Sequence, residues 1–471
     1  MSSDGIVEIG ADRQLFVDDS LIGGSQGVER VLHSPARKGV AVAAEHPWER
    51  VISAFFLTLH DGEKSRMYYL CSAEPEQGWY HCAYAESDDG IEWRKPNLGI
   101  IEFGGSKENN LVYGGPHTEF APFLDANPDV RPDERYKAFV VSDFEGRVGK
   151  PALVPLASPD GLQWRPLSDG PMLTDGPFDS HNLPFWDTWR GEYVLYARGR
   201  GTRSHTRAPD TYVSDPQQGP VRWIRRATSP DFRHWTPLVD IDCGDAPFEH
   251  LYTNACTPYE RAPGTYLMFP SRFVQYRMPD NEVARQASAG SGVNDIVLMS
   301  SRDGLHFDRS FLEAFIRPGL DVENWRERGI YAGRGLVQTS PSELSIYARE
   351  HRYQPTVHIR RYALRTDGFV SMHAGYGGGE LITEPFIFSG RSLALNYSTS
   401  AVGSVQVEVQ DAEGHPQAGF GLDDCPEMFA DEIEGMVTWE DHPDLSVLAG
   451  QPVRLRFRLV DADLYALKFN D

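Results

Sequence analysis

The chain is poor in the features that mark secreted or membrane proteins. It has five cysteines in 471 residues, an odd number without CxxC spacing, so it offers neither a disulfide framework nor a zinc site. No apolar run approaches the length of a membrane span, and residues 1–5 lack the basic and apolar regions of a signal peptide. We therefore expect a soluble, cytoplasmic protein that does not bind membranes.

Positive charge is also scarce. The 45 lysines and arginines are outnumbered by 68 aspartates and glutamates, which gives a formal net charge of −23. A charge of this sign repels phosphate backbones, so no nucleic-acid partner is expected. Long helical periodicity is absent as well, which favours an all-β fold.

One phrase recurs down the sequence at a nearly constant interval. Its copies begin at Ser87, Ser158, Ser229 and Ser301, which are 71, 71 and 72 residues apart, and a worn fifth copy spans residues 365–369. Each full copy reads Ser-x-Asp, with Trp or Phe four positions after the Asp. Self-similarity at a fixed period indicates an array of one supersecondary unit, and five units favour a closed ring.

Each unit has the pattern of a small antiparallel sheet. A tyrosine-rich apolar run, such as residues 192–196, is followed by a second apolar strand and then by the phrase, which reads as a turn. The predicted fold is a five-bladed β-propeller over residues 1–375, with the segment around 15–17 closing the ring. Residues 376–471 alternate with period two, lack the phrase, and are expected to form a β-sandwich. The aspartates of the phrase should be turn residues: Asp89, Asp160, Asp231 and Asp303.

The phrase also carries a resemblance. The segment 227–235, Ala-Thr-Ser-Pro-Asp-Phe-Arg-His-Trp, resembles the blade pattern of five-bladed propeller glycoside hydrolases, the invertase, levanase, arabinanase and β-xylosidase group of the family 32 and 43 type. It is also similar to the Asp box of sialidases, although there a residue separates Asp from Gly. The resemblance implies a glycosidase whose substrate sits in a central funnel lined by acids from the innermost strands. The Trp-x-Asn-Asp-Pro-Asn, Arg-Asp-Pro and Glu-Cys motifs of the fructan-cleaving members are missing, so fructose specificity is not implied.

Carboxylates occur where the innermost strands are expected. Four blades each supply one, namely Glu49, Asp125, Asp179 and Glu249, and we expect these four to converge on one axial pocket. Glycosidic cleavage needs one carboxylic acid and one carboxylate, and acids that converge in a dry funnel raise one another's pKa. Asp179 and Glu249 are the predicted catalytic pair and Asp125 an orienting acid, while the assignment of acid and base stays open.

Residues near these acids are candidates for sugar binding, because they offer donors, acceptors or a stacking face. For His181 the alternative is a buried structural histidine, and for Trp48 it is packing between blades. The arginines would bind a carboxylate or phosphate, or else neutralise the acids. The candidates are Trp48, Glu49, Arg50, His181, Asn182, Tyr252, Asn254, Arg272 and Arg334.

The leading functional hypothesis is a glycoside hydrolase that uses carboxylates in the central funnel to cleave a glycosidic bond in a small carbohydrate substrate, a short oligosaccharide or a glycoside. Two alternatives remain: a glycoside phosphorylase in which the arginines hold inorganic phosphate, and a non-catalytic propeller that binds carbohydrate or protein. No cofactor and no metal are expected. A structural calcium, as in some of the enzymes resembled, has no ligand run such as an EF-hand loop to support it. The sequence leaves open whether the protein forms a homo-oligomer.

Overall fold

We analysed a computed structural model of the protein, which describes residues 6–74, 81–114, 118–143, 151–201, 221–278, 292–326, 328–440 and 444–471. These residues form β-strands and three short 3-10 helices: η1 (Pro47–Glu49), η2 (Pro132–Glu134) and η5 (Val322–Trp325). Among the described residues, no helix is long and apolar enough to cross a membrane. The chain divides into two compact units, a propeller (Pro35–Pro258 and Gly264–Ala363) and a second unit (Met1–Ser34, Tyr259–Pro263 and Leu364–Asp471).

The first three blades are four-stranded antiparallel sheets whose strands follow sequence order. Blade 1 contains β6 (Val51–His60), β7 (Ser65–Ser72), β8 (His81–Ser87) and β9 (Leu111–Gly114). Blade 2 contains β10 (Thr118–Leu124), β11 (Tyr136–Asp143), β12 (Pro151–Ser158) and β13 (Arg165–Pro166). Blade 3 contains β14 (Leu183–Asp187), β15 (Glu192–Gly201), β16 (Val221–Ser229) and β17 (Val239–Asp240). The tyrosine-rich runs form the second strand of each blade, as the sequence predicts.

Blade 4 is split into two short sheets. One contains β18 (Leu251–Tyr252), β21 (Ser271–Val274) and β22 (Val293–Ile296), and the other contains β19 (Thr257–Pro258), β20 (Tyr266–Met268) and β23 (Met299–Ser301). The polypeptide therefore crosses the blade with a break in each long strand.

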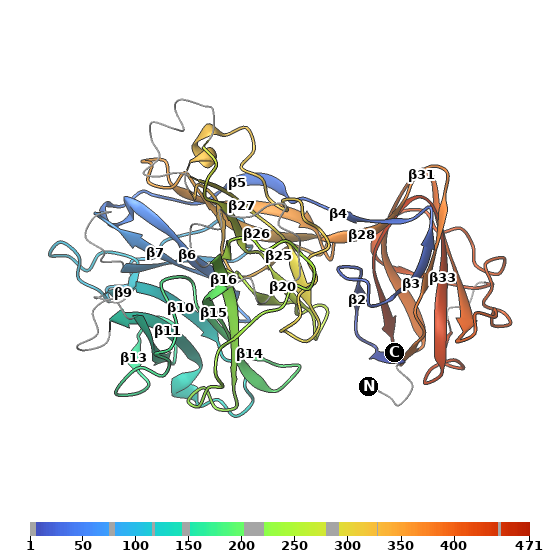
Figure 1. Cartoon of the computed structure of the whole chain (residues 1–471), viewed down its shortest axis with the longest axis horizontal. Coiled ribbons are helices and arrows are strands. Elements are labelled where there is room, and N and C mark those ends of the chain that lie inside the picture. Colours follow the sequence, from blue (N-terminus) through green and yellow to red (C-terminus); the bar gives the residue numbers. More distant parts are fainter. Residues whose placement is uncertain are drawn as a thin grey trace. The chain divides into compact units, whose positions relative to one another are not determined.

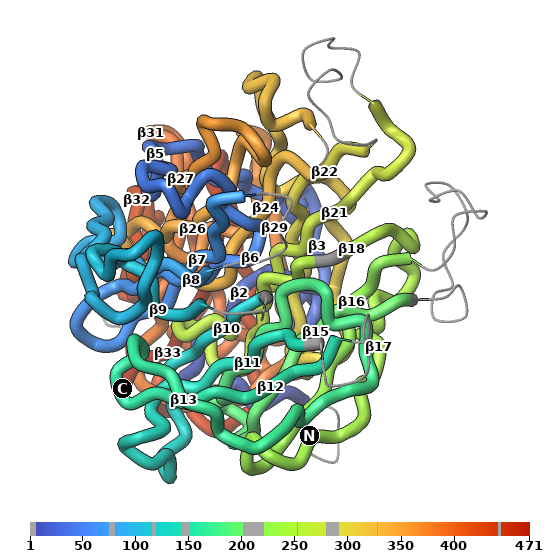
Figure 2. Tube along the Cα trace, turned by 90° about the vertical axis from the view of Figure 1, so that its left-hand side faces the viewer, coloured from blue at the N-terminus to red at the C-terminus, as the bar shows by residue number. Residues whose placement is uncertain are grey.

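Blade 5 closes the ring with a strand from the beginning of the propeller. It contains β24 (Tyr331–Ala332), β25 (Val337–Ser340), β26 (Glu343–Glu350) and β27 (His358–Arg365), and β27 pairs with β5 (Ala36–Ala43). Figure 2 shows the blades following one another around the ring, from blue through teal, green and yellow to orange, with β5 beside β27. The five-bladed propeller is confirmed, but the expected closure by residues 15–17 is wrong, because β5 leads directly into blade 1 and supplies that strand.

The recurring phrase is a turn, as its sequence predicts. In the first copy, one carboxylate oxygen of Asp89 accepts hydrogen bonds from the backbone N–H groups of Ile91 at 2.7 Å and Glu92 at 2.9 Å. The same pair of bonds recurs in the other three full copies, at Asp160, Asp231 and Asp303. These carboxylates cap turns.

The tyrosine runs tie neighbouring blades together. A buried tyrosine of blades 1, 3 and 5 donates its hydroxyl proton to a backbone carbonyl in the phrase of the next blade around the ring. The pairs are Tyr68 with Gly161 at 3.1 Å, Tyr196 with Gly304 at 2.5 Å, and Tyr347 with Gly90. The last pair joins blade 5 to blade 1 and helps to close the ring. Gly90 has φ +71°, and a Cβ there would lie 2.6 Å from the Val337 side chain, so only glycine fits.

The second unit combines both ends of the chain in one ten-stranded hydrogen-bonded network. Its C-terminal strands are β28 (Val370–Ala374), β29 (Gly379–Thr383), β30 (Phe386–Phe388), β31 (Ser392–Asp411), β32 (Asp431–Met436) and β33 (Pro452–Asn470). Its N-terminal strands are β1 (Val7–Gly10), β2 (Gln14–Leu15), β3 (Ile22–Gln26) and β4 (Glu29–Leu32). Figure 1 shows β2 and β3, in blue, beside the orange and red strands β31 and β33.

This pairing changes the domain boundary that the sequence suggested. Residues 1–34 were expected in the propeller, but β1 pairs with β30, β2 with β33, β3 with β29 and β4 with β28. Phe16 belongs to the apolar core of the second unit together with Trp439 and Phe457. The period-two pattern of residues 376–471 therefore needs the N-terminal strands to complete its core. The strand content agrees with the expected β-sandwich.

The fifth, worn copy of the phrase has a different role. Asp367 is fully buried in the second unit, where its carboxylate pairs with Arg261 at 2.9 Å and Arg13 at 3.2 Å and accepts the Tyr259 hydroxyl at 2.5 Å. Burial acts to raise the pKa of Asp367, but these partners outweigh it and hold the pKa below its usual range. This copy has become an ion-pair centre in the core.

Candidate active site

The innermost strands of the propeller surround a cavity of about 330 Å³, which we call the axial cavity. Blade 1 contributes the first residues of β6, and blades 2, 3 and 5 contribute most of the charged side chains. The lining residues are Val51, Ile52, Ser53, Ala54, Phe55, Leu70, Glu119, Asp179, Arg198, Arg222, Arg328, Tyr331, Arg349, Arg352 and Tyr353. Pairing of β6 with β7 shifts register between Ile52 and Phe56, so an irregularity in β6 borders this cavity.

Glu119 is the acid that blade 2 places in the axial cavity. It lies in a bulge of β10, where the register with β11 shifts between Thr118 and Ala121, and its φ is +63°. A non-glycine residue held in this region costs about 1–3 kcal/mol, and bulges of this kind often re-aim a side chain beside an active site. The residue is only 6% exposed. Its backbone is therefore distorted in a way that carries a carboxyl group into the cavity.

The surroundings of Glu119 favour its protonated form. Burial raises the pKa of Glu119 well above its usual range, against the opposing effects of the Arg198 charge and a hydrogen bond from the backbone of Ser180. The side-chain amide nitrogen of Asn182 lies 3.5 Å from the carboxyl oxygen. A carboxylic acid kept protonated towards neutral pH is suited to donate a proton.

Asp179 provides a second carboxylate of opposite character. It precedes β14 of blade 3, its side chain is 62% exposed, and it forms an ion pair with Arg198. An adjacent guanidinium favours the ionised form of a carboxylate. Arg198 thus interacts with both acids: it forms an ion pair with Asp179, and its positive charge opposes the rise in the pKa of Glu119. The axial cavity combines a buried acid whose pKa is raised with an exposed carboxylate that is paired with a guanidinium.

Arginines of blades 3 and 5 form much of the remaining wall. Arg349 of β26 is 1% exposed, lies 5.1 Å over the Tyr331 ring and donates to the backbone carbonyl of Arg328 at 3.0 Å. Arg352 follows in the turn after β26, with its guanidinium 4.1 Å over the Tyr353 ring. Aromatic faces hold these guanidinium groups in defined orientations.

Arg222, at the start of β16, also lines the axial cavity. Its guanidinium lies 5.1 Å over the Phe273 ring and 3.3 Å from the side-chain oxygen of Gln275. Its backbone N–H donates to the imidazole of His250 at 3.0 Å. Burial, together with the charges of Arg222 and Arg198, lowers the pKa of His250 to about 4, so this imidazole is neutral near neutral pH.

The sequence contains a signal for these arginines that the predicted site did not include. In blades 3 and 5 the tyrosine that bonds to the next blade is followed by Ala and Arg, as Tyr196-Ala-Arg198 and Tyr347-Ala-Arg349. The equivalent position in blade 1 is Leu70, two residues after Tyr68, and it also lines the axial cavity. Residues two apart share a face of a strand, so this position reaches the cavity in all three blades.

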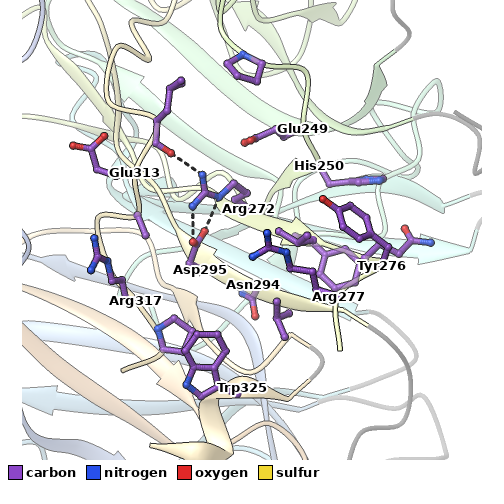
Figure 3. A pocket seen from close by; sticks show the side chains of 18 of the residues that line it. Glu249, His250, Arg272, Tyr276, Arg277, Asn294, Asp295, Glu313, Arg317 and Trp325 are labelled. Carbon is purple, nitrogen blue, oxygen red and sulfur yellow. Dashed lines mark hydrogen bonds and ion pairs between the residues drawn. The ribbon is translucent and has the colours of Figure 1, made fainter. Parts of the chain in front are cut away.

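A larger cavity of about 710 Å³, the lateral cavity, lies against blade 4 (Figure 3). Arg272 makes a two-bonded ion pair with Asp295 at 2.9 and 2.6 Å, and Figure 3 shows this pair in the middle of the wall. Glu249 lines the same cavity and pairs at 2.5 Å with Arg309, which is buried. Trp325 and Tyr276 present partly exposed rings at its edge. The charged lining residues are Glu249, Asp295, Glu313, Arg272, Arg277 and Arg317.

The predicted convergence of four carboxylates is therefore corrected. Asp179 alone of the four lines the axial cavity, and Glu249, which precedes the split blade 4, lines the lateral cavity. Asp125 lies at the far end of β10 from Glu119, buried in an ion pair with Lys137 and bonded to the Tyr193 hydroxyl at 2.8 Å. Its partners give it a structural role within and between blades 2 and 3.

Glu49 also has structural partners. It is fully buried at the end of η1, where its carboxylate accepts from Lys95 at 2.8 Å and from the Tyr69 hydroxyl at 2.5 Å. Trp48 is 8% exposed, donates from its indole to Asn110 at 3.0 Å and stacks on His46, so it packs within the propeller. Neither residue lines the axial or the lateral cavity.

The predicted binding residues His181 and Asn182 of blade 3 and Asn254 of blade 4 are buried and do not line the axial cavity. Asn182 bonds to the carbonyls of Phe178 at 2.9 Å and Ser180 at 2.6 Å, and Asn254 bonds to the carbonyl of His181 at 3.2 Å. Burial, together with the charge of Arg334, lowers the pKa of His181 to about 3. These side chains support the backbone that carries Asp179 and do not line the cavity.

Arg334 connects the inner parts of several blades. Its backbone N–H donates to the carbonyl of Phe56 at 3.3 Å, and its side-chain Nε donates to the carbonyl of Cys256 at 3.3 Å. Its guanidinium lies 5.4 Å over the Phe185 ring. Arg272 is placed in the lateral cavity. Arg50 is exposed after η1 and lines neither cavity. The side chain of Tyr252 lies outside the described residues.

One cluster of the described residues has metal-ligating groups close together. Ligand atoms of Glu350, His351 and His358 lie within 4.8 Å of one another. The Glu350 carboxylate, however, is already bonded by Arg37 at 2.5 Å and Arg360 at 2.9 Å. Two guanidinium groups on this carboxylate oppose the binding of a further cation. The cluster is better explained as a buried ion-pair network in blade 5.

Comparisons with known proteins leave the function open. No protein-family model and no curated protein sequence matches this protein. Among solved structures, it is similar to BT0996 in a complex with RGII, with 14% identity and a TM-score of 0.47, over 71% of this protein and 93% of that one. It is similar to a glycoside hydrolase with 14% identity and a TM-score of 0.46, over 70% of this protein and 92% of that one. It is also similar to an N-acetylgalactosamine deacetylase from F. plautii in complex with blood group B trisaccharide, with 12% identity and a TM-score of 0.44, over 73% of this protein and 97% of that one. Likenesses this distant do not establish an activity, and the propeller assignment rests on the strand pairing itself.

Proposed function

We propose that the protein is a glycosidase and that its reaction takes place in the axial cavity. The observation that carries this proposal is the presence, in one cavity, of a buried acid with a raised pKa and an exposed carboxylate next to a guanidinium. Glycosidic cleavage needs this combination, because one group must protonate the leaving oxygen while the other attacks the anomeric carbon or activates water.

In this proposal Glu119 is the proton donor. Burial raises the pKa of its carboxyl group, which favours the protonated form, and the bulge in β10 places Glu119 in the lining of the axial cavity. Positioning of this kind lets a general acid act without reorganisation. Asp179 is the ionised partner, since Arg198 stabilises its negative charge. Of the catalytic pair predicted from the sequence, this assignment retains Asp179 and replaces Glu249 with Glu119.

The cavity also suits a sugar in size and lining. Its volume of about 330 Å³ lies at the lower end of the range of roughly 300–1,000 Å³ typical of small-molecule sites, which favours a single sugar unit or the end of a short oligosaccharide. Phe55, Tyr331 and Tyr353 supply apolar or aromatic surface beside the charged groups. The proposed substrate is therefore a small carbohydrate or an oligosaccharide that presents one end to the cavity.

The test is a screen of aryl glycosides and oligosaccharides, with mass analysis of products, on wild type, Glu119→Gln and Asp179→Asn. Glu313→Gln, which changes an exposed acid of the lateral cavity, is the matched control. We expect cleavage by wild type and the control, and a loss of about 10²–10⁴-fold in each axial variant. Unchanged rates in both axial variants would refute the assignment.

A glycoside phosphorylase is the second candidate, because arginines line the same cavity and guanidinium groups bind phosphate well. The same screen, repeated with and without inorganic phosphate, separates the two reactions. A phosphorylase releases a sugar phosphate and depends on added phosphate, whereas a hydrolase releases the free sugar in either condition. Binding of sugars without cleavage in any condition would instead support a carbohydrate-binding propeller.

A further inference from the structure

The proposed reaction leaves the larger, lateral cavity unused, and one buried side chain in its lining has an unsatisfied polar atom. His250 is 5% exposed, and its Nε2 atom has no hydrogen-bond partner among the residues that the structure describes. Figure 3 shows this residue among the side chains that line the cavity. Buried polar atoms in native proteins are nearly always hydrogen-bonded, so this exception points to a partner from outside the chain.

The bonds at the other ring nitrogen determine what His250 offers to such a partner. Its Nδ1 lies 3.0 Å from the backbone nitrogen of Arg222 and 3.4 Å from Nη1 of the same residue. Both of these groups only donate, so Nδ1 accepts and the ring proton is on Nε2. Burial, together with the charges of Arg222 and Arg198, lowers the pKa of His250 to about 4, so the ring is neutral. His250 therefore presents one N–H donor, which suits an uncharged oxygen such as a sugar hydroxyl.

Trp325 supplies an apolar face to the same cavity. It is the last residue of η5, its indole Nε1–H donates to the carbonyl of Gly319 at 2.7 Å, and it is still 39% exposed. Because the polar atom of the ring is already bonded, the ring offers a ligand its apolar surface. The C–H groups on one face of a sugar ring pack well on such a surface, and aromatic side chains commonly line small-molecule sites.

The ion pair of Arg272 and Asp295 supplies hydrogen-bond acceptors without net charge. Each oxygen of Asp295 accepts one bond from Arg272, at 2.9 and 2.6 Å, and the two side chains are partly exposed, 18% for Arg272 and 20% for Asp295. Arg272 also donates to the carbonyl of Leu312 at 2.6 Å, which helps to hold the pair in place. A carboxylate oxygen has two lone-pair sites, so Asp295 can accept further bonds from sugar hydroxyls.

The charge and size of the lateral cavity favour an uncharged ligand of more than one sugar unit. Its described lining contains three arginines and three acids, whose formal charges sum to zero. Its volume of about 710 Å³ is roughly twice that of the axial cavity and lies within the range of roughly 300–1,000 Å³ typical of small-molecule sites. A neutral disaccharide or trisaccharide matches this cavity better than a monosaccharide or an ion.

We propose that the lateral cavity is a second carbohydrate-binding site, which binds a neutral disaccharide or trisaccharide without cleaving it. Trp325 packs against a sugar ring, His250 donates from Nε2 to a sugar oxygen, and Asp295 accepts from a hydroxyl. The inference rests on the proposed function only in taking the ligand to be a carbohydrate. It goes beyond that function, because the acids assigned to cleavage, Glu119 and Asp179, line the axial cavity.

Binding of neutral oligosaccharides tests the inference. Titration calorimetry is carried out on the full-length wild type and on Glu119→Gln, in which the proposed cleavage is blocked. The probes are maltose, cellobiose, lactose, xylobiose, mannobiose and the trisaccharides of the same series, with digalacturonic acid as the charged probe. We expect at least one neutral probe to bind both proteins, with an affinity that changes little with salt. Binding of no probe, or of digalacturonic acid alone, would overturn the inference.

Two variants and one control locate the contact. Trp325→Ala removes the ring, and His250→Asn keeps an acceptor near the position of Nδ1 but removes the Nε2–H donor. Each should weaken binding by about threefold to tenfold. Trp189→Ala is the matched control, because Trp189 is 56% exposed and lines neither cavity, and it should leave the affinity unchanged. Thermal unfolding checks that each variant is folded. Full affinity in every folded lateral variant, or an equal loss in the control, would contradict the assignment.

Further outcomes separate this inference from the proposed activity. Binding that depends on Trp325, without cleavage of any glycoside, would overturn the glycosidase and leave the second site standing. Cleavage that is lost in Glu119→Gln, without any binding that depends on Trp325 or His250, would do the reverse. Binding by wild type that disappears in folded Glu119→Gln would place the sugar in the axial cavity and overturn the second site.

Discussion

The axial and lateral cavities lie on either side of one wall, in which Arg222 stacks on Phe273 and Phe273 clusters with Tyr331. The lateral cavity is about twice as large, 710 against 330 Å³, but its Arg272 is paired with Asp295 and its Glu249 with the buried Arg309. The axial cavity is smaller, and among the described residues it combines an acid of raised pKa with an exposed carboxylate that is paired with a guanidinium. The raised pKa and the strained backbone of Glu119, and not cavity volume, are therefore the grounds for placing the proposed reaction in the axial cavity.

The largest expected difference between the two cavities is in catalysis. Glu119→Gln removes the proposed proton donor and should lower kcat/KM on glycosides with poor leaving groups by about 10²–10⁴-fold. Glu313→Gln changes an acid of the lateral cavity and should leave the rate near that of wild type. Steady-state kinetics on the best substrate of the screen measures both. The comparison fails if the lateral variant loses as much activity as the axial one.

The second prediction concerns Glu249, whose replacement should lower stability and leave activity per folded molecule unchanged. Glu249→Gln leaves the buried Arg309 guanidinium without its carboxylate, and loss of one partner of a buried ion pair costs about 3–5 kcal/mol. We expect a marked fall in Tm and in the free energy of unfolding, with kcat per folded molecule close to wild type. Denaturant unfolding together with kinetics measures the two quantities. Loss of turnover in a fully folded Glu249→Gln protein would restore this residue to the catalytic pair.

The pH dependence of stability should also distinguish Glu119. Because burial raises its folded pKa above the ordinary value of 4.5, the stability that this group contributes is present below about pH 4.5 and is lost as pH rises through the folded pKa. Glu119→Gln carries no ionisable group there, so its stability relative to wild type should increase with pH over this window. Unfolding free energies at a series of pH values measure the difference. A constant difference at all pH values would show that the folded pKa of Glu119 is not raised.

The smallest expected effect concerns the exposed aromatic edge of the lateral cavity. Tyr276 is 51% exposed, and Tyr276→Ala should change the free energy of unfolding by no more than about 0.5 kcal/mol, as exposed substitutions usually do. Its kcat/KM on a short substrate should equal that of wild type. Measurement on both short and long oligosaccharides sharpens the comparison. A loss on long substrates alone would show that the lateral cavity binds the sugar units that lie beyond the cleaved bond.

Much of the fold was predictable because its signals are repeated. The Ser-x-Asp turns and the tyrosine runs serve the same purpose in successive blades, since a tyrosine such as Tyr196 bonds to the turn glycine of the next blade. Ring closure and the boundary of the second unit were not predictable in this way. They depend on pairing between strands more than 300 residues apart, such as β5 with β27 and β2 with β33, for which the period gives no information.

The site was predictable only in part, because it lies where the blades depart from their pattern. Asp179 was found because blade 3 is regular. Glu119 was missed because a bulge brings it to the cavity from six residues before Asp125, and Glu249 adjoins blade 4, whose split the repeat pattern does not reveal. Arg198 and Arg349 were missed although each follows a blade-linking tyrosine by two positions. Local irregularities and three-dimensional charge balance do not appear in a repeat pattern.

The most direct test of the central claim, that Glu119 in the axial cavity donates the proton to the leaving group, is the leaving-group dependence of the Glu119→Gln variant. A dinitrophenyl glycoside departs without protonation, whereas an alkyl or sugar leaving group needs an acid. The kcat/KM ratio of variant to wild type is measured on both kinds of glycoside of the same sugar. The account predicts a ratio near one for the dinitrophenyl glycoside and a fall of about 10²–10⁴-fold for the sugar leaving group. Equal ratios for the two substrates would contradict it.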